Sequence, residues 1–235
     1  MEPIVYDLCE EANIECCRIG NEQQEVLVVD DFLKGAGALK ERAVYENNFA
    51  RADSFYPGVR MEVPREYTIA IVKNLGFFME RFFNLEVRTI KKAVSKFSIV
   101  TTRPGDLGLL QRIPHFDSPS RKGIAVVHYL QSIPNMGTAL YRHKPTSFEY
   151  VDEQRYSNYM AQIQERFPTE DKYPEGYING STDQFEQIAS FDAIFNRLLM
   201  YRGTSLHSGK IGKDYNFDPS PATGRLTLTS FFEFK

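Results

Sequence analysis

The sequence predicts a mainly β protein, either a sandwich or a barrel, with helices packed against its sheets. Two segments with helical spacing come first, and a run of short segments rich in β-branched and aromatic residues follows. The 13 Tyr and 18 Phe residues, with no Trp, suit the pleated surfaces of a β-rich core. Helices followed by a series of strands are typical of β layers that helices buttress.

The first part of the chain predicts one strand and two helices. Residues 25–29 are apolar and β-branched, and a segment rich in Ala, Leu, Lys and Glu follows at about 35–47. A turn at Tyr56-Pro57-Gly58 precedes the second helical segment, 65–83. That segment carries apolar residues at helical spacing, so we expect it to pack on a flat surface.

The later part of the chain predicts strands interrupted by a helical insert. The predicted strands are 85–87, 95–101, 123–130, 138–143, 196–202 and 225–234. Between the fourth and fifth strands, 147–167 and 181–194 have helical character, and Thr146 with Glu149 has capping-box spacing. We therefore predict one domain over 1–235, with a peripheral segment at 1–24 and a helical insert at 145–192.

Composition excludes several classes of function. The net charge is −3 and the pI is about 5.9, and no basic run is present, so we expect no nucleic acid partner. The apolar runs reach about four residues, against the 20 or so that cross a bilayer, so we expect no membrane partner. The acidic amino terminus is unlike a signal peptide, and the three cysteines have no zinc-site spacing. These features predict a cytoplasmic protein with reduced thiols.

Two histidines and one aspartate form a candidate metal site. His115 and Asp117 lie two residues apart, and the flanking prolines favour an extended segment in which both side chains point to one face. His207, after a later strand, could supply a second imidazole. Two histidines and one carboxylate form the facial triad that holds non-haem Fe(II) with open positions.

Arg225 opens the last predicted strand and is a candidate carboxylate-binding residue. Alternation places it on one face with Thr227 and Thr229, opposite Leu226 and Leu228. A guanidinium that faces the interior of a narrow β structure needs an anion, and it matches a carboxylate as a two-pronged donor. The alternative is that Arg225 pairs with a protein acid such as Glu233.

Four other residues have both a functional and a structural interpretation. His128 lies on the opposite face from Tyr129 and is predicted to be structural, whereas His143 is expected at the surface. Arg60 could bring positive charge near a substrate, or it could be a solvated side chain after an ordinary turn. Arg202 could face a substrate or form a surface ion pair.

In this order, the motifs resemble the Fe(II)/2-oxoglutarate-dependent oxygenases, and in particular their prolyl-hydroxylase-like branch. The resemblance covers most of residues 25–235. It rests on motifs and not on dense identity: Val28-Val29-Asp30-Asp31-Phe32-Leu33, His115-Phe116-Asp117-Ser118-Pro119, Tyr129-Leu130-Gln131, Gly137-Thr138-Ala139-Leu140, His207 and Arg225-Leu226-Thr227.

The resemblance implies a double-stranded β-helix, or jelly roll, with helices packed on one sheet. It also implies that His115, Asp117 and His207 bind iron, and that Arg225 holds the distal carboxylate of 2-oxoglutarate with help from Tyr129 and Thr227. The chain departs from the family pattern in Gln131, which replaces an Asn, in the long insert, and in the polar loop 210–223. Because Asp117 is present, the resemblance does not extend to the halogenating enzymes.

Two classes of function remain. The first is an Fe(II)/2-oxoglutarate-dependent dioxygenase that uses O₂ to hydroxylate a small-molecule or peptidyl substrate. The second is a cupin-like metal-binding jelly roll, an isomerase or a ligand-sensing module, that does not use 2-oxoglutarate. Arg225 and Tyr129 favour the first class, because the second needs no carboxylate clamp at that spacing. Specificity would reside in the loops 50–65, 145–190 and 208–223, which carry no readable code.

Overall fold

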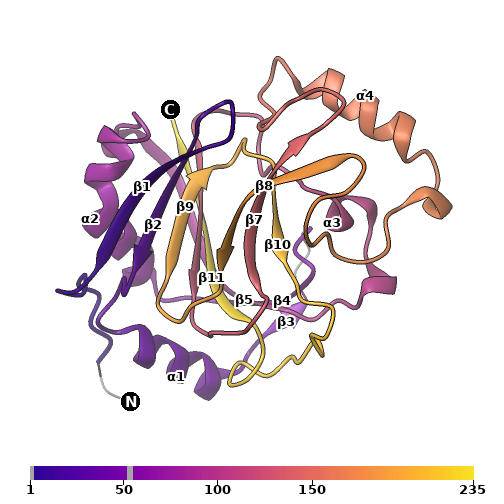
Figure 1. The fold of residues 1–235 in the computed structure, drawn as a ribbon. Helices are drawn as coiled ribbons and strands as arrows, with labels where there is room; N and C mark the ends of the chain where they lie inside the picture. Colours follow the sequence, from indigo (N-terminus) through magenta and orange to yellow (C-terminus); the bar gives the residue numbers. More distant parts are fainter. Residues whose placement is uncertain (1–2, 52–54) are drawn as a thin grey trace.

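Two antiparallel sheets form the body of the protein (Figure 1). The computed structural model describes residues 3–51 and 55–235. Residues 1–2 of the predicted peripheral segment and 52–54 of the predicted specificity loop lie outside the described residues. The larger sheet has the strand order β1-β2-β9-β6-β11-β5-β4-β3, and the smaller sheet has the order β10-β7-β8. The prediction of a mainly β fold with a helical buttress is confirmed.

The helices and strands have the following bounds. The larger sheet contains β1 (Asn13–Ile19), β2 (Gln24–Asp30), β3 (Ala50–Arg51), β4 (Gly58–Glu62), β5 (Ile90–Val100), β6 (Gly123–Tyr129), β9 (Leu198–Arg202) and β11 (Leu226–Phe234). The smaller sheet contains β7 (Gly137–His143), β8 (Phe185–Asp192) and β10 (His207–Lys210). The helices are α1 (Ala36–Glu46), α2 (Arg65–Arg81), α3 (Leu109–Arg112) and α4 (Tyr156–Arg166), with short 3₁₀ turns at Val87–Thr89, Pro104–Asp106 and Glu170–Lys172.

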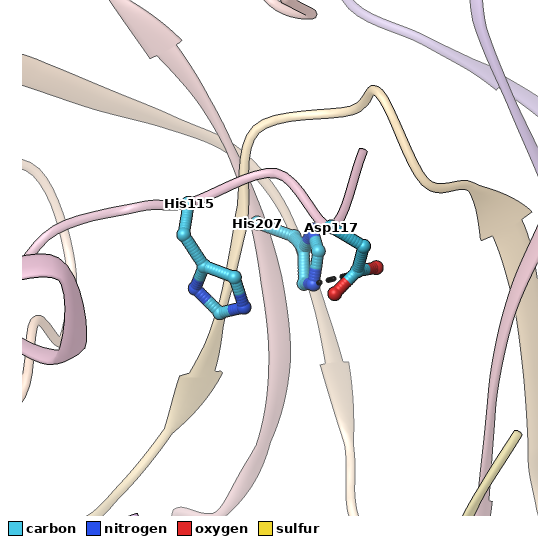
Figure 2. Close-up of side chains that lie close together, drawn as sticks. All are labelled: His115, Asp117 and His207. Carbon is cyan, nitrogen blue, oxygen red and sulfur yellow. Dashed lines mark ion pairs between the residues drawn. The ribbon is translucent and has the colours of Figure 1, made fainter. Parts of the chain in front are cut away.

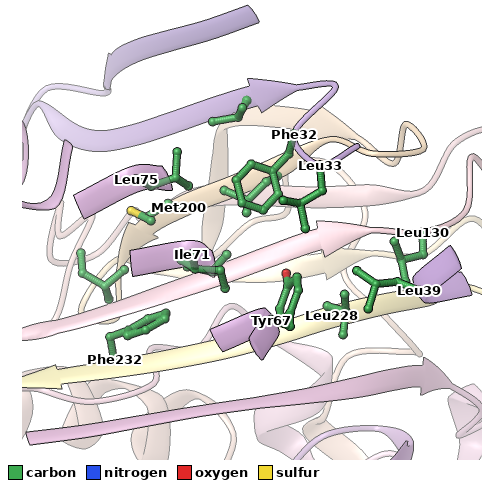
Figure 3. Close-up of a cluster of buried hydrophobic side chains, with 14 of the residues drawn as sticks. Phe32, Leu33, Leu39, Tyr67, Ile71, Leu75, Leu130, Met200, Leu228 and Phe232 are labelled. Carbon is green, nitrogen blue, oxygen red and sulfur yellow. The ribbon is translucent and has the colours of Figure 1, made fainter. Parts of the chain in front are cut away.

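One face of the larger sheet packs against α1 and α2, as the spacing in 65–83 predicts. Figure 3 shows side chains from both helices and from the strands meeting in one apolar layer. His128 on β6 belongs to this face. Its two ring nitrogens lie 3.2 Å from the Tyr67 hydroxyl and 3.0 Å from Asn196 Oδ1. The structural role predicted for His128 is therefore confirmed.

The opposite face of the larger sheet, here called the inner face, lies against the smaller sheet. Val28, Tyr129 and Tyr201 of the larger sheet form a buried cluster with Leu140 of β7. Side chains alternate along a strand, so in the larger sheet the residues on either side of Val28, Tyr129 and Tyr201 point to the face that packs against α1 and α2. The inner face is thus the one available to a site enclosed between the two sheets.

The predicted helix at 181–194 is wrong, because this segment contains strand β8, paired with β7. Gln187 and Ala189 pair with consecutive residues of β7, so Ile188 is the extra residue of a β-bulge. Phe185 packs on one face of β8, and Ile188 and Phe191 pack on the other, so apolar residues recur every three positions, as they do in a helix. The helix predicted at 147–167 is shorter in the structure and begins at Tyr156.

The predicted capping box at Thr146 and Glu149 is also wrong. The fully buried Glu149 carboxylate accepts the backbone N–H groups of Asn21 and Glu22 at 2.8 Å each and pairs with Arg142. It therefore fastens the turn between β1 and β2 to the insert. The amino-terminal segment, predicted to be peripheral, contributes edge strand β1 to the larger sheet.

Two smaller expectations are corrected by packing. The predicted strand 85–87 instead leads into a 3₁₀ turn, because Leu85 donates its backbone N–H to Met79 and closes the end of α2. His143, expected at the surface, is only 1% exposed. Its ring packs against Tyr159 of α4 and Phe185 of β8, and its Nδ1 lies 2.9 Å from Thr146 Oγ1. Within the described residues, no helix has the length and apolar character needed to cross a membrane.

Candidate metal centre and carboxylate site

The extended segment 115–117 lies beside the start of β10. His115 and His207 form an isolated antiparallel bridge in which each backbone N–H donates to the other's carbonyl at 2.8 Å. The backbone N–H of Asp117 donates to Gly203 O at 2.7 Å. These three hydrogen bonds fix the segment to the chain around β10. The extended conformation predicted from the flanking prolines is confirmed.

The side chains of His115, Asp117 and His207 converge at this bridge. One ligand atom from each residue lies within 4.8 Å of the others, and His207 Nε2 is 3.7 Å from Asp117 Oδ2. The two imidazole centroids are 4.4 Å apart. Figure 2 shows the three side chains on the same side of their backbone segments. Such a donor set, two imidazoles and one carboxylate, fits a divalent transition metal with open coordination positions.

The contacts around His207 orient its ring. Nδ1 lies 2.9 Å from the carbonyl oxygen of Ser205, so the neutral imidazole donates there and keeps the Nε2 lone pair for a ligand. The ring of Tyr201 lies against it with centroids 4.7 Å apart. His207 is buried, whereas 19% of the Asp117 side chain is exposed, so the site is open on the aspartate side.

The protonation of the three residues favours metal binding near neutral pH. Burial lowers the pKa of His115 to about 4, with His207 acting in the same direction and Asp117 opposing it. Burial also lowers the pKa of His207 to about 4. The pKa of Asp117 is raised to about 6 by burial, although His115 and Arg60 oppose that rise. At pH 7 the imidazoles are neutral and most of the carboxyl groups are ionised, which are the forms that bind metals.

Arg225 lies just before β11 and faces the interior, as its alternation predicts. Its Nη2 donates to the Gly137 carbonyl oxygen at 2.8 Å, and its backbone N–H donates to the Tyr215 hydroxyl at 3.0 Å. The residue is 5% exposed, and within the described residues its Nε–H has no hydrogen-bond partner. The alternative partner, Glu233, instead pairs with Lys91 at 2.7 Å. A buried guanidinium with an unused donor fits a carboxylate ligand.

Tyr129 and Thr227 lie beside Arg225. The guanidinium carbon lies 5.6 Å from the centroid of the Tyr129 ring, and the Tyr129 hydroxyl is 2.6 Å from Thr138 Oγ1. Thr227 pairs with Tyr129 across β11 and β6, and its hydroxyl donates to Ser98 O at 3.3 Å. The structure therefore brings the three residues assigned to 2-oxoglutarate by resemblance into one group.

Three tyrosines that the sequence did not predict as site residues lie at the site. Tyr201 lies against His207, and Tyr215, from the loop 210–223, accepts the backbone N–H of Arg225. Tyr56 is buried, and its hydroxyl interacts with Arg225 and Thr227. Alternation could have placed Tyr201 on the inner face, but no pattern distinguishes Tyr56 or Tyr215 from other loop tyrosines.

The structure places Arg202 and Arg60, which each had two possible roles, in different environments. Arg202 forms an ion pair with Glu25 at 2.7 Å, so its structural interpretation holds. Arg60 is half-buried on β4, and its guanidinium lies over the Tyr56 ring at 4.5 Å. Burial lowers the pKa of Arg60, while Tyr56 and Asp117 raise it. Arg60 is therefore close enough to the candidate metal site to interact with one of its ligands.

A family model matches almost the whole chain, over residues 10–232. The chain belongs to this family. It is described as a family of unknown function, DUF6445. A comparison with the curated proteins finds no match.

Two solved structures of non-haem enzymes have a similar fold. The DUF6445 chain is similar to the α-ketoglutarate-dependent carbocyclase SnoK from nogalamycin biosynthesis, with 10% identity and a TM-score of 0.51 over 100% of this chain and 87% of SnoK. It is also similar to the epimerase SnoN of the same biosynthesis, described as α-ketoglutarate-dependent, with 9% identity and a TM-score of 0.50 over 92% of this chain and 79% of SnoN. At this identity the similarity shows the fold, and the predicted jelly roll is confirmed.

Proposed function

We propose that this protein is a non-haem Fe(II)/2-oxoglutarate-dependent dioxygenase. The observation that carries the proposal is the coexistence of two features. A two-histidine, one-carboxylate cluster and a buried arginine with an unused donor both lie between the sheets of a jelly roll. The similarity in fold to two α-ketoglutarate-dependent enzymes supports the same conclusion.

His115, Asp117 and His207 would hold the Fe(II). When bound with 2-oxoglutarate, the iron would supply the activation of O₂ for oxidation of a C–H bond. The protein's own contribution is to keep both imidazoles neutral and fixed and to leave the Asp117 side open. The hydrogen bond between His207 Nδ1 and Ser205 O keeps the correct nitrogen free for the metal.

Arg225 would bind the distal carboxylate of 2-oxoglutarate. Its Nε–H is unpaired within the described residues, and the hydrogen bond to Gly137 O holds the guanidinium in place. Tyr129 and Thr227 would line this part of the site beside it. A charged pair in such a buried position is stronger than one on the surface, because the low local dielectric weakens it less.

The finer parts of the proposal rest on the sequence motifs. We propose hydroxylation of a small-molecule or peptidyl substrate, a relationship to the prolyl-hydroxylase-like branch, one oxygenase-like domain over 1–235, and a cytoplasmic location. The three free cysteines are in keeping with a reducing compartment. A cupin-like protein that does not use 2-oxoglutarate is the alternative, and the unpaired donor of Arg225 argues against it.

Anaerobic calorimetry with 2-oxoglutarate tests the proposal. Because the 2-oxo acid would chelate the metal as well as contact Arg225, we expect stoichiometric binding to Fe(II)-loaded protein and much weaker binding to metal-free protein. Absence of binding to the loaded protein would favour the cupin-like alternative. Equal binding with and without metal would contradict chelation at the proposed site.

A further inference from the structure

Arg60 belongs to the same row of residues as the proposed 2-oxoglutarate site. In the register of the larger sheet, Tyr129 of β6 pairs with Thr227 of β11, which pairs with Ser98 of β5, which pairs with Arg60 of β4. Residues paired in this way point to the same face of a sheet. Arg60 therefore projects from the inner face, two strands away from Thr227.

The ring of Tyr56 connects the two arginines of the inner face. The guanidinium carbon of Arg60 lies over this ring, 4.5 Å from its centroid, and the Tyr56 hydroxyl interacts with Arg225. The Arg60 charge in turn interacts with Asp117. Arg60 thus lies within electrostatic reach of the candidate metal centre, on a different side of Tyr56 from Arg225.

No protein anion neutralises Arg60 in the part of the chain that the structure describes. Asp117 Oδ2 lies 3.7 Å from Nε2 of the neutral His207, and within the described ranges no ion pair joins Asp117 to Arg60. The Nε–H of Arg60 is buried and without a hydrogen-bond partner among the described residues. The contact with Tyr56 orients the guanidinium but uses none of its N–H donors. A buried donor without a partner, on the same sheet face as the proposed 2-oxoglutarate site, fits an acceptor supplied by a ligand.

With metal and 2-oxoglutarate bound, the formal charges at the site would sum to one positive charge. A divalent metal and the 2-oxoglutarate dianion cancel each other's formal charge. Of the other side chains, Arg60 and Arg225 are positive, Asp117 as a metal ligand is a carboxylate, and His115 and His207 as metal ligands are neutral imidazoles. The loaded site would keep one positive charge, which one carboxylate would neutralise.

We propose that Arg60 binds a carboxylate of the primary substrate, which makes the substrate a monocarboxylic acid or a molecule that carries such a group. This inference rests on the proposed function, because it assumes that 2-oxoglutarate occupies Arg225. Arg60 then determines specificity for acids over their neutral analogues. A carboxylate of 2-oxoglutarate itself would have the same chemistry, so the experiment must distinguish the two sources.

Arginine side-chain NMR separates these possibilities. Protein labelled with ¹⁵N-arginine is loaded with diamagnetic Zn(II) in place of Fe(II), and the Nε–H signals of Arg60, Arg225 and Arg202 are assigned by Arg→Lys variants. The protein is saturated with 2-oxoglutarate and then titrated with acetate, or with acetamide as the neutral control. Arg202, already paired with Glu25, is the internal reference.

We expect 2-oxoglutarate to shift the Arg225 signal and acetate to shift the Arg60 signal saturably, with no response to acetamide. The Arg202 signal should not move. In Arg60→Gln, acetate binding to the 2-oxoglutarate-saturated protein, measured by calorimetry, should weaken by at least about tenfold, because the charged two-pronged contact is lost. If the Gln variant does not fold, Arg60→Lys should show a smaller loss, since it keeps the charge but not the two-pronged donor.

Three results would overturn the inference, and they are distinguishable from failure of the proposed function. If acetate does not shift the Arg60 signal, or if acetamide shifts it equally, the role of Arg60 would be structural and limited to its packing on Tyr56. An Arg60 signal that 2-oxoglutarate itself moves, with loss of the acetate response, would assign Arg60 to the cosubstrate. If 2-oxoglutarate moves neither arginine signal, the proposed function fails at Arg225.

Discussion

The imidazole of His207 is held on two sides, by Ser205 O at Nδ1 and by the ring of Tyr201, while Nε2 remains directed toward Asp117. This arrangement follows from the bridge between His115 and His207, which joins residues 92 positions apart in the chain. Sequence spacing predicted which residues meet there, because His-x-Asp in an extended segment already fixes two of the three directions. The partners Ser205 and Tyr201 are tertiary features that spacing alone does not predict.

Arg225 gives the clearest prediction at the residue scale. Arg225→Ala should weaken 2-oxoglutarate binding to the metal-loaded protein by at least about tenfold, since a charge-assisted contact contributes about 1.5–3 kcal/mol. Arg225→Lys should recover part of the affinity, because the charge remains and the two-pronged donor does not. Anaerobic calorimetry measures both. Wild-type affinity in Arg225→Ala would show that the carboxylate binds elsewhere, and Arg202→Ala serves as the matched control outside the site.

His128 predicts a specific pH dependence of stability. Burial lowers its pKa to about 4 from an ordinary value of 6.5, so the folded state resists protonation that the unfolded state accepts. Stability is therefore full above about pH 6.5 and falls as the pH drops toward 4, by about 3 kcal/mol from this residue. His128→Gln should lose that part of the acid sensitivity. Urea unfolding of both proteins at pH 7 and pH 4.5 measures the difference, and parallel losses in the two proteins would contradict the assignment.

At the scale of elements, the sequence predicted those with one clear period and missed those shaped by neighbours. The helical pattern in 65–83 and the alternation in 225–234 both match the structure, because α2 packs on one sheet face and the two faces of β11 contact different layers. Strand β8 was missed, since it carries apolar residues on both faces, with a bulge at Ile188, and these residues recur every three positions as in a helix. His143 looked exposed because its neighbours Arg142 and Lys144 are charged, yet α4 covers it.

At the scale of elements, we predict the effect on stability of removing the Glu149 carboxylate. Glu149→Ala should destabilise the protein by about 3 kcal/mol, because the variant leaves Arg142 and two backbone N–H groups without their common acceptor. The matched control is Glu186→Ala, which removes the other acid on Arg142 from a position where 47% of the side chain is exposed. That variant should cost less than about 1 kcal/mol.

Chemical denaturation and amide exchange measure the effect of the Glu149 variant. The amides of Asn21 and Glu22 should exchange faster in Glu149→Ala than in the wild type, since they lose their acceptor. Equal destabilisation by the two variants would mean that Arg142 alone, and not the buried carboxylate, fastens the turn between β1 and β2.

In the whole molecule, the two faces of the larger sheet differ: one packs in an apolar core, and the other carries the residues of the proposed site. The face under α1 and α2 is an apolar core that includes the structural His128, and the inner face carries Arg60, Thr227 and Tyr129. The sequence could predict two-faced strands, but not the order of β4, β5, β11 and β6. That order places Arg60 in one row with Thr227 and Tyr129, so the role that we propose for Arg60 could be inferred only from the folded chain.

The most direct test of the central claim is the visible spectrum of Fe(II)-loaded protein titrated with 2-oxoglutarate under anaerobic conditions. We expect the charge-transfer band of iron chelated by a 2-oxo acid, which saturates at one equivalent. The band should be absent in His207→Gln and present in His143→Gln, whose altered side chain lies outside the metal cluster. A wild-type protein that binds Fe(II) but gives neither the band nor measurable 2-oxoglutarate binding would contradict the account.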